Sequence, residues 1–294
     1  MQRALLLTLA LLIPATVRAQ ERLSEPLAAS LEQVVSAPRD AWRSKSVEVF
    51  RWDLFPDILI LDTADYQIQG RYFSRLAYFL EKRGFRGRLL TNGELAGRHG
   101  WNAHDYGAPG LAEFFNAASA KGFGLNPEER MLEGLALREG FLVADGERVA
   151  PGAGGVLGVS LSSSVIERRY LLAHESFHGV FFSSASYREL CFQLWDTLPP
   201  EERSFYLRFL DSLGYDAAVR SLAVNEFQAY LMQQPLTSML SYFQRFVTRF
   251  ATDTTDADMV AAGLRKAASE LDAWLRKTYG FGAGGPLFEF FKER

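Results

Sequence analysis

The first half of the chain alternates between strand-like and helix-like patterns of apolar residues. Residues 47–51 alternate apolar and polar positions, as a half-buried strand does. Residues 58–61 form an unbroken apolar run, which is typical of a central strand covered on both faces. Residues 65–83 have the period of an amphipathic helix, and residues 88–91 can return as a neighbouring strand. These elements together predict a β-α-β unit.

Glycine and polar residues then separate several shorter elements. Residues 92–110 predict a loop, which either forms a cleft wall or only covers the surface. Helices are predicted at residues 112–121 and 127–139. Residues 141–150 predict a hairpin with an Asp-Gly turn, and residues 156–161 predict a further strand.

The second half of the chain has a helical pattern almost throughout. Its helices are predicted at residues 187–198, 200–213, 217–234, 236–250 and 256–277. Residues 280–294 combine glycines with large apolar residues, so we expect this tail to dock onto the body. An α/β half followed by a helical half predicts an α+β fold.

The N-terminal residues predict processing and export. Residues 1–19 have the basic start, the short apolar stretch and the small residue, Ala19, of a cleaved signal peptide. We expect the mature chain to begin at Gln20 and the protein to be secreted or periplasmic. Residues 20–44 would then form a leader segment, either helical or loose.

Composition narrows the classes of partner. Hydrophobic residues make up 48% of the chain and include 23 Phe, which predicts a sizeable core. The net charge is −3, with both signs interspersed, so the sequence offers no basic patch for nucleic acid. No stretch after the signal is apolar for the ~18 residues of a membrane helix, and no membrane anchor is expected. Cys191 is the only cysteine, which excludes an internal disulfide and predicts a core residue.

An apolar helical run at residues 171–182 contains two histidines four positions apart. Such positions lie roughly 6 Å apart on one face of an α-helix, so the imidazoles of His174 and His178 can bind one metal ion. Glu175 would lie beside that ion, where a carboxylate can accept a proton from activated water.

The alternative is a pair of buried histidines satisfied by their neighbours. The chain has only four histidines, and two of them fall in this motif with a glutamate between them. Unpaired polar groups inside an apolar helix cost roughly 1–3 kcal/mol each. A bound metal ion would remove that cost.

The motif formed by His174, Glu175 and His178 resembles that of the zincin metallopeptidases. A catalytic zinc needs a third protein ligand and an open position for water. The metzincin branch takes this ligand from an extended motif with glycine at 181 and histidine at 184. This chain has Phe181 and Ser184, which excludes that branch.

A second segment resembles the gluzincin branch, in which a downstream helix supplies a glutamate. Residues 225–229 read Asn-Glu-Phe-Gln-Ala and are similar to the Asn-Glu-x-x-Ala of that branch. The resemblance implies that Glu226 is the third ligand. It is confined to these two short segments and departs at Tyr230, where thermolysin-like enzymes have an aspartate that orients a histidine ligand.

The resemblance also implies a zincin-like arrangement of two lobes. An α/β lobe with a mixed sheet would span residues 45–165, and a helical lobe carrying the metal helix would span residues 166–294. Zincins have an edge strand upstream of the metal helix, against which an extended peptide pairs. Residues 156–161 are either that strand or an ordinary hairpin partner.

The expected function is that of a secreted, zinc-dependent, peptidase-like hydrolase acting on a peptide or protein. The implied zinc ligands are His174, His178 and Glu226, and Glu175 is the implied general base. The candidates for the oxyanion partner are Tyr230, His99 and His104. A non-catalytic zincin-fold binding or scaffold protein is the alternative, against which the intact Glu175 argues; an accidental motif in a structural protein is the third possibility.

Overall fold

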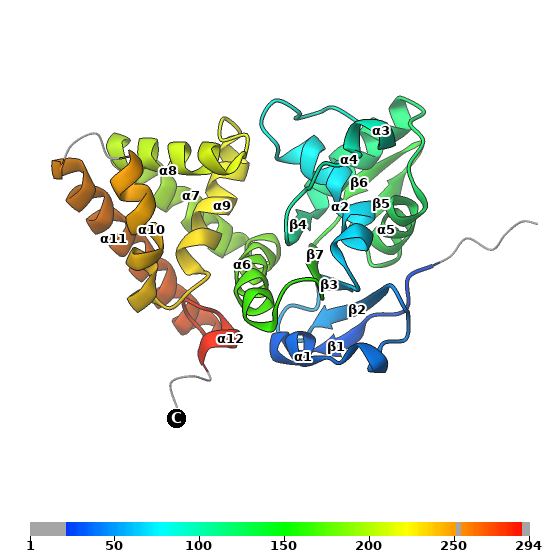
Figure 1. Cartoon of the computed structure of the whole chain (residues 1–294), viewed down its shortest axis with the longest axis horizontal. Helices are drawn as coiled ribbons and strands as arrows, with labels where there is room; N and C mark the ends of the chain where they lie inside the picture. Colours follow the sequence, from blue (N-terminus) through cyan, green and yellow to red (C-terminus); the bar gives the residue numbers. More distant parts are fainter. Residues whose placement is uncertain (1–21, 251–253, 290–294) are drawn as a thin grey trace, which may run out of the picture.

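The computed structural model describes residues 22–250 and 254–289. In these residues an α/β half is followed by a mainly helical half, so the fold is α+β as predicted (Figure 1). The predicted signal peptide, residues 1–19, lies outside the described residues, as does the end of the predicted docking tail, residues 290–294.

A five-stranded mixed sheet organises the first half, with the strand order β1-β2-β3-β7-β4. The strands are β1 (Leu27–Ala29), β2 (Val47–Trp52), β3 (Ile58–Thr63), β4 (His104–Gly107) and β7 (Gly155–Ser160). The pairs β1–β2 and β3–β7 are parallel, whereas β2–β3 and β4–β7 are antiparallel. The strand β4 therefore runs along one edge of the sheet.

The central strand β3 is covered on both faces, as its unbroken apolar run predicts. Leu59 and Leu61 pack with the helix α2 (Tyr66–Leu80) on one face. Ile58 and Ile60 pack with the helix α6 (Val165–Ser183) on the other. Gly179 lets α6 approach closely, because a Cβ atom there would lie 3.3 Å from both Ile58 and Trp52.

Two predictions about this half are wrong, and one of the two alternatives for residues 156–161 is excluded. Residues 88–91 form no strand; they lead into the short helix α3 (Asn92–Leu95), and β7 takes the place beside β3. The strand β7 is flanked on both sides, so it is not the edge strand. The edge strand β4 comes from residues 92–110, which were predicted as a loop.

The predicted leader segment also belongs to the sheet. Its strand β1 pairs with β2, and the helix α1 (Leu31–Ser36) follows, capped by Ser30. A 3₁₀ turn, η1 (Arg39–Ala41), leads on toward β2. A three-residue strand has too few positions to show a period, so the pattern could not reveal it.

The remaining elements agree closely with the sequence pattern. The first half also contains α4 (Ala108–Ala120), α5 (Pro127–Arg138) and the separate hairpin of β5 (Leu142–Asp145) and β6 (Arg148–Pro151). The second half contains α7 (Ala185–Thr197), α8 (Pro200–Leu213), α9 (Arg220–Met232), α10 (Leu236–Phe250), α11 (Thr254–Tyr279) and α12 (Pro286–Glu289).

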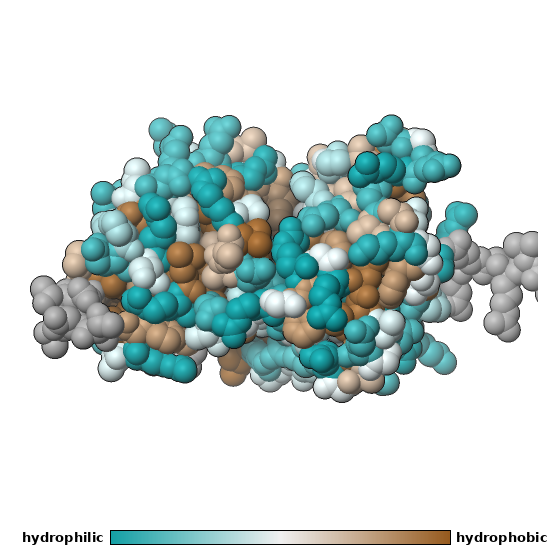
Figure 2. Space-filling model, turned by 90° about the horizontal axis from the view of Figure 1, so that it is seen from above, coloured by the Kyte–Doolittle hydropathy of each residue, from teal (hydrophilic) through white to brown (hydrophobic). Residues whose placement is uncertain are grey.

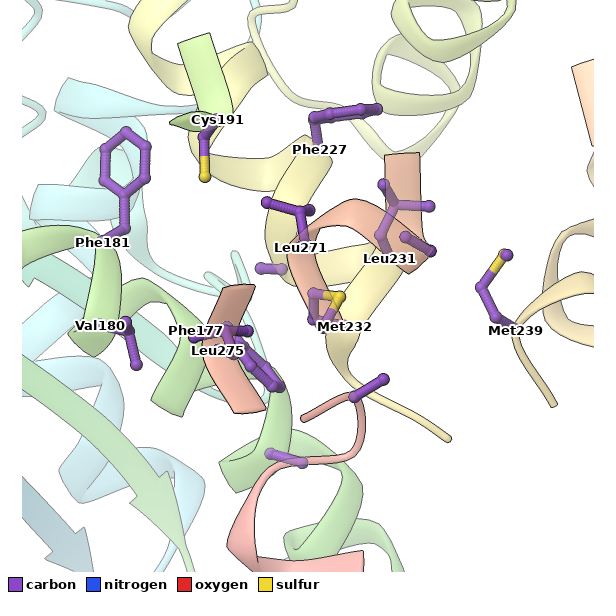
Figure 3. Packing of buried hydrophobic residues seen from close by; sticks show 14 of the residues in the cluster. Phe177, Val180, Phe181, Cys191, Phe227, Leu231, Met232, Met239, Leu271 and Leu275 are labelled. Atoms are coloured by element: carbon purple, nitrogen blue, oxygen red, sulfur yellow. The ribbon is translucent and has the colours of Figure 1, made fainter. Parts of the chain in front are cut away.

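The helix α6 lies between the two halves (Figure 1), and its buried apolar residues belong to the cluster that joins one face of the sheet to the helical half. Figure 3 shows side chains of α6, α7, α9 and α11 gathered in the core of the helical half. Cys191 lies there, fully buried as predicted. The tail docks as predicted: Leu287 is buried, and Gly284 N donates a hydrogen bond to Met232 O at 2.7 Å.

Hydrophilic residues dominate the face seen in Figure 2, with smaller hydrophobic groups scattered over both halves. None of the helices in the described residues is long and apolar enough to cross a membrane.

Candidate metal centre

The N-terminal turn of α6 anchors the helix on the sheet. The hydroxyl of Ser164 caps the helix by accepting a hydrogen bond from Glu167 N. Arg168 then donates two hydrogen bonds of 2.8 Å to Asp62 of β3, and both side chains are buried. This contact sets the position of the next three turns, which carry the histidines.

The two predicted histidine ligands meet on one face of α6. Their Nε2 atoms lie 3.0 Å apart. Glu226 of α9 faces both rings, with one carboxylate oxygen 3.6 Å from His174 Nε2 and the other 3.8 Å from His178 Nε2. All three residues are buried. The structure therefore brings together the three residues that the sequence assigns to a metal.

The helix α9 presents a whole face to His174. Glu226, Tyr230 and Gln233 are spaced by four and then three residues, so they lie on one side of the helix. The Tyr230 ring packs against the His174 ring at 4.5 Å between centroids. His174 Nδ1 lies 2.9 Å from Gln233 Oε1, and an amide oxygen only accepts, so Nδ1 carries the proton. The lone pair of His174 is left on Nε2, which points into the cluster.

Asp105 of β4 lies beside the second histidine, whose buried Nδ1 finds no hydrogen-bond partner among the described residues. Its Oδ2 lies 3.4 Å from His178 Nδ1 and accepts a hydrogen bond from Asn225 Nδ2 at 3.1 Å. A carboxylate in this position favours the tautomer of His178 that has its lone pair on Nε2. Asp105 therefore lies where a carboxylate can orient His178, in place of the aspartate that the sequence lacks at Tyr230.

Neither Asp105 nor Gln233 was identified from the sequence as part of the site. Gln233 follows Glu226 by seven residues, two helical turns, and this spacing was the available signal. The only sequence signal for Asp105 was the alternation of a four-residue strand. The side to which its side chain points depends on the pairing of that strand with β7.

The electrostatics of the cluster are unbalanced toward negative charge. Burial, followed by the charges of Glu226 and Glu81, raises the pKa of Glu175 well above its usual value. Burial also raises the pKa of Asp105 well above its usual value, and the charges of Glu175, Glu81 and Glu226 act in the same direction. Burial lowers the pKa of His178 to about 4, despite the opposing effect of Glu226. The protein itself thus provides little positive charge to compensate these carboxylates.

The donor set fits a metal ion. Tetrahedral bonds of ~2.1 Å place neighbouring ligand atoms roughly 3.4 Å apart. Here the two Nε2 atoms are 3.0 Å apart, Glu226 Oε2 is 3.6 Å from His174 Nε2, and Glu226 Oε1 is 3.8 Å from His178 Nε2. Glu226 Oε2 and Glu175 Oε2 are buried and find no hydrogen-bond partner among the described residues. A divalent cation would supply both the missing partner and the missing charge. His174, His178 and Glu226 can therefore hold a metal ion.

No family model, curated protein or solved structure matches this chain. The interpretation of the site therefore rests on its own geometry.

Two cavities flank the cluster. One, of about 780 Å³, is lined by His174 and Glu175 and has a largely aromatic wall. The aromatic residues of that wall are His99, Trp101, Tyr170, Tyr215, Tyr230 and Tyr242. The other cavity, of about 460 Å³, is lined by Glu81, Asp105 and Asn225 together with apolar residues of β4, α6, α7 and α9.

The three candidate oxyanion partners occupy different places. Tyr230 and His99 line the larger cavity beside His174 and Glu175. His104 does not, because alternation along β4 directs it to the opposite side from Asp105, where it packs on Phe73 and contacts Tyr106. Burial lowers the pKa of His104 well below its usual value, so this ring is neutral. His104 is therefore removed as a candidate.

Proposed function

We propose that this protein is a zinc-dependent, peptidase-like hydrolase. The observation that carries the proposal is the convergence of His174, His178 and Glu226 beside a carboxylate, Glu175, that has an unpaired buried oxygen. A purely structural cluster has no use for an additional unpaired acid, whereas hydrolysis needs a base next to the metal.

His174, His178 and Glu226 would hold the ion, and their two imidazoles and one carboxylate are a donor set that suits zinc. When bound, zinc acts as a Lewis acid that polarises a carbonyl group and lowers the pKa of water toward about 7. Gln233 keeps a proton on His174 Nδ1, and the carboxylate of Asp105, 3.4 Å from His178 Nδ1, favours a proton on that atom. These contacts keep both Nε2 lone pairs available to the ion.

Glu175 is the proposed general base. Its carboxylate accepts the proton of the attacking water and later donates it to the leaving amine. The side chain is buried, so it takes part in this transfer with little competition from bulk water. Tyr230 and His99 line the same cavity and remain the candidate partners of the oxyanion.

A zincin-like fold of the gluzincin type is part of the proposal. The mixed sheet, the metal helix between two halves and the glutamate on a later helix support it. The edge strand β4 would then be the strand along which a peptide or protein substrate lies. The signal-like N-terminus supports action outside the cytoplasm.

The test compares two Glu→Gln variants of α6 on a peptide library, with and without a chelator. Glu175→Gln should retain zinc and the fold but lower turnover by at least ~10²-fold, because an amide cannot accept the proton of water. Glu167→Gln, on the exposed first turn of the same helix, should behave as the wild type.

Near-normal hydrolysis by Glu175→Gln would remove that residue from the role of base. Zinc bound at the three ligands without any cleavage by the wild type would favour the binding or scaffold protein instead. A chain that binds no zinc would reject the proposal.

A further inference from the structure

Two segments from opposite halves of the molecule pair with each other above the metal centre. Arg83 N donates a hydrogen bond to Gly214 O at 3.0 Å, and Asp216 N donates one to Glu81 O at 2.6 Å. Lys82 and Tyr215, which lie between these bonds, form an antiparallel bridge pair. In Figure 1 the chain between α2 and α3 reaches toward the segment between α8 and α9. We call residues 81–83 and 214–216 the cross-cleft bridge.

Side chains reinforce the cross-cleft bridge. Trp101 stacks on Tyr215 at 4.5 Å between ring centroids, with 21° between the planes. Its Nε1 donates a hydrogen bond of 2.5 Å to Glu81 Oε2, and the Lys82 ammonium lies over its ring. Glu81 and Tyr215 are both buried. These contacts are buried or aromatic, so bulk water competes for them less than for an exposed ion pair.

The cross-cleft bridge separates the two cavities that flank the metal centre. Glu81 lines the smaller cavity together with Asp105 and Asn225. Lys82, Trp101 and Tyr215 line the larger one together with His174 and Glu175. A molecule lying across the metal centre would therefore have to pass beneath this connection between the halves. Glu175 below it is only 4% exposed.

A closed connection limits the shape of the substrate. A chain with a free end can be fed into the larger cavity as far as Glu175. A loop of a folded protein, or a peptide ring, has no end to insert and would need the two halves to part. Parting would break both backbone hydrogen bonds and the contact between Trp101 and Tyr215.

Building on the proposed function, we infer that the cross-cleft bridge stays closed during turnover and that the substrates are linear chains entering by a free end. The substrate class is thus unfolded peptides or the loose termini of proteins, to the exclusion of internal loops and rings.

A disulfide across the cross-cleft bridge tests this inference. Lys82 and Tyr215 are a non-hydrogen-bonded antiparallel pair, for which the expected Cα separation of about 4.5 Å falls within the range of disulfides. The double variant Lys82→Cys/Tyr215→Cys can therefore be locked by oxidation, and its reduced form is the matched control. Cys191 is fully buried and cannot compete for pairing.

The substrates are one peptide in linear form and the same sequence joined head to tail. The wild type should cleave the linear form at least ~10²-fold faster than the ring. The oxidised variant should cleave the linear form within about threefold of its reduced form. Equal cleavage of ring and linear peptide, or loss of linear cleavage on oxidation, would overturn the inference.

Hydrogen exchange gives a measurement that needs no activity. The amides of Arg83 and Asp216 donate the two bonds of the cross-cleft bridge, so they should exchange as slowly as those of α2. Exchange as fast as in the loop at residues 122–125 would mean that the halves part readily, and would overturn the inference. Absence of linear cleavage would instead count against the proposed function, and exchange would still report on the bridge.

Discussion

The helix α6 carries two buried polar groups that differ in how their charges are compensated. At its N-terminal turn, Arg168 meets Asp62 through two hydrogen bonds and donates a third to Val34 O at 3.1 Å. Two turns later lies Glu175, which faces Glu226 of α9, and each of these acids keeps a buried oxygen without a partner among the described residues. The first group is a matched pair of opposite charges, and the second is a set of acids around two imidazoles.

The difference shows that burial alone does not identify a functional site. Burial raises the pKa of Asp62, but its hydrogen bonds and charge interaction with Arg168 act in the opposite direction. At Glu175 burial and two other acids act in the same direction. A buried acid that has its own cation fits a structural role, whereas one surrounded by further acids fits a role that needs an added cation.

The largest effect is expected from removing a proposed ligand in the second group, the acids around the two imidazoles. Glu226→Ala should weaken zinc binding by at least ~10³-fold, more than the 10–100-fold typical of residues that only orient ligands. Helix content should be retained, which circular dichroism would check alongside titration with zinc. His99→Ala and His104→Ala are the controls and should leave the affinity nearly unchanged. Release of zinc by the histidine changes, but not by Glu226→Ala, would refute the ligand assignment.

Removing the cation of the first group should cost stability. Arg168→Ala leaves Asp62 buried without its partner, so the free energy of unfolding should fall by about 3–5 kcal/mol. The control is Arg220→Ala, which removes a partner that contacts both carboxylate oxygens of Asp196 through its Nη2 atom, where both side chains are more than half exposed. That change should cost at most about 1 kcal/mol.

Denaturant unfolding of the metal-free proteins would measure both values, so that zinc binding does not contribute. Equal losses for the two arginines would show that the pair at the start of α6 has no special role in anchoring the helix.

The smallest effect is expected at the residue that orients His178. Asp105→Asn removes the negative charge next to His178 Nδ1 and should weaken zinc binding by about 10–100-fold. Asp145→Asn, an exposed aspartate in the strand β5, is the control. If both variants bind zinc equally well, Asp105 does not orient the histidine.

The sequence predicted most helices, the central strands and the residues that meet at the metal centre. The predictions of helices succeed where a helix of 15 residues shows its amphipathic period clearly, as α2 and α10 do. The two histidines were paired correctly because His174 and His178 are related by helix geometry alone. Glu226 was identified only through its neighbouring residues and their resemblance to a known motif.

The parts that depend on long-range pairing were missed. The strands β1 and β4 have three and four residues, and each forms only against a partner far away in the chain. The contact of Asp105 with His178 and the pairing of residues 81–83 with residues 214–216 have the same origin. The apolar pattern within a segment does not indicate which distant strand or segment it will pair with.

The docked tail has a consequence for folding during synthesis of the protein. Phe281 and Leu287 complete the core against α6, and the Phe281 ring lies 6.3 Å from that of Phe177, which precedes it by 104 residues. At 5–20 residues per second, a ribosome needs roughly 5–20 s to make that intervening chain. During this interval the helix that carries both histidines has emerged without its final cover. The nascent chain therefore passes through a stage in which apolar side chains of α6 still need protection from aggregation.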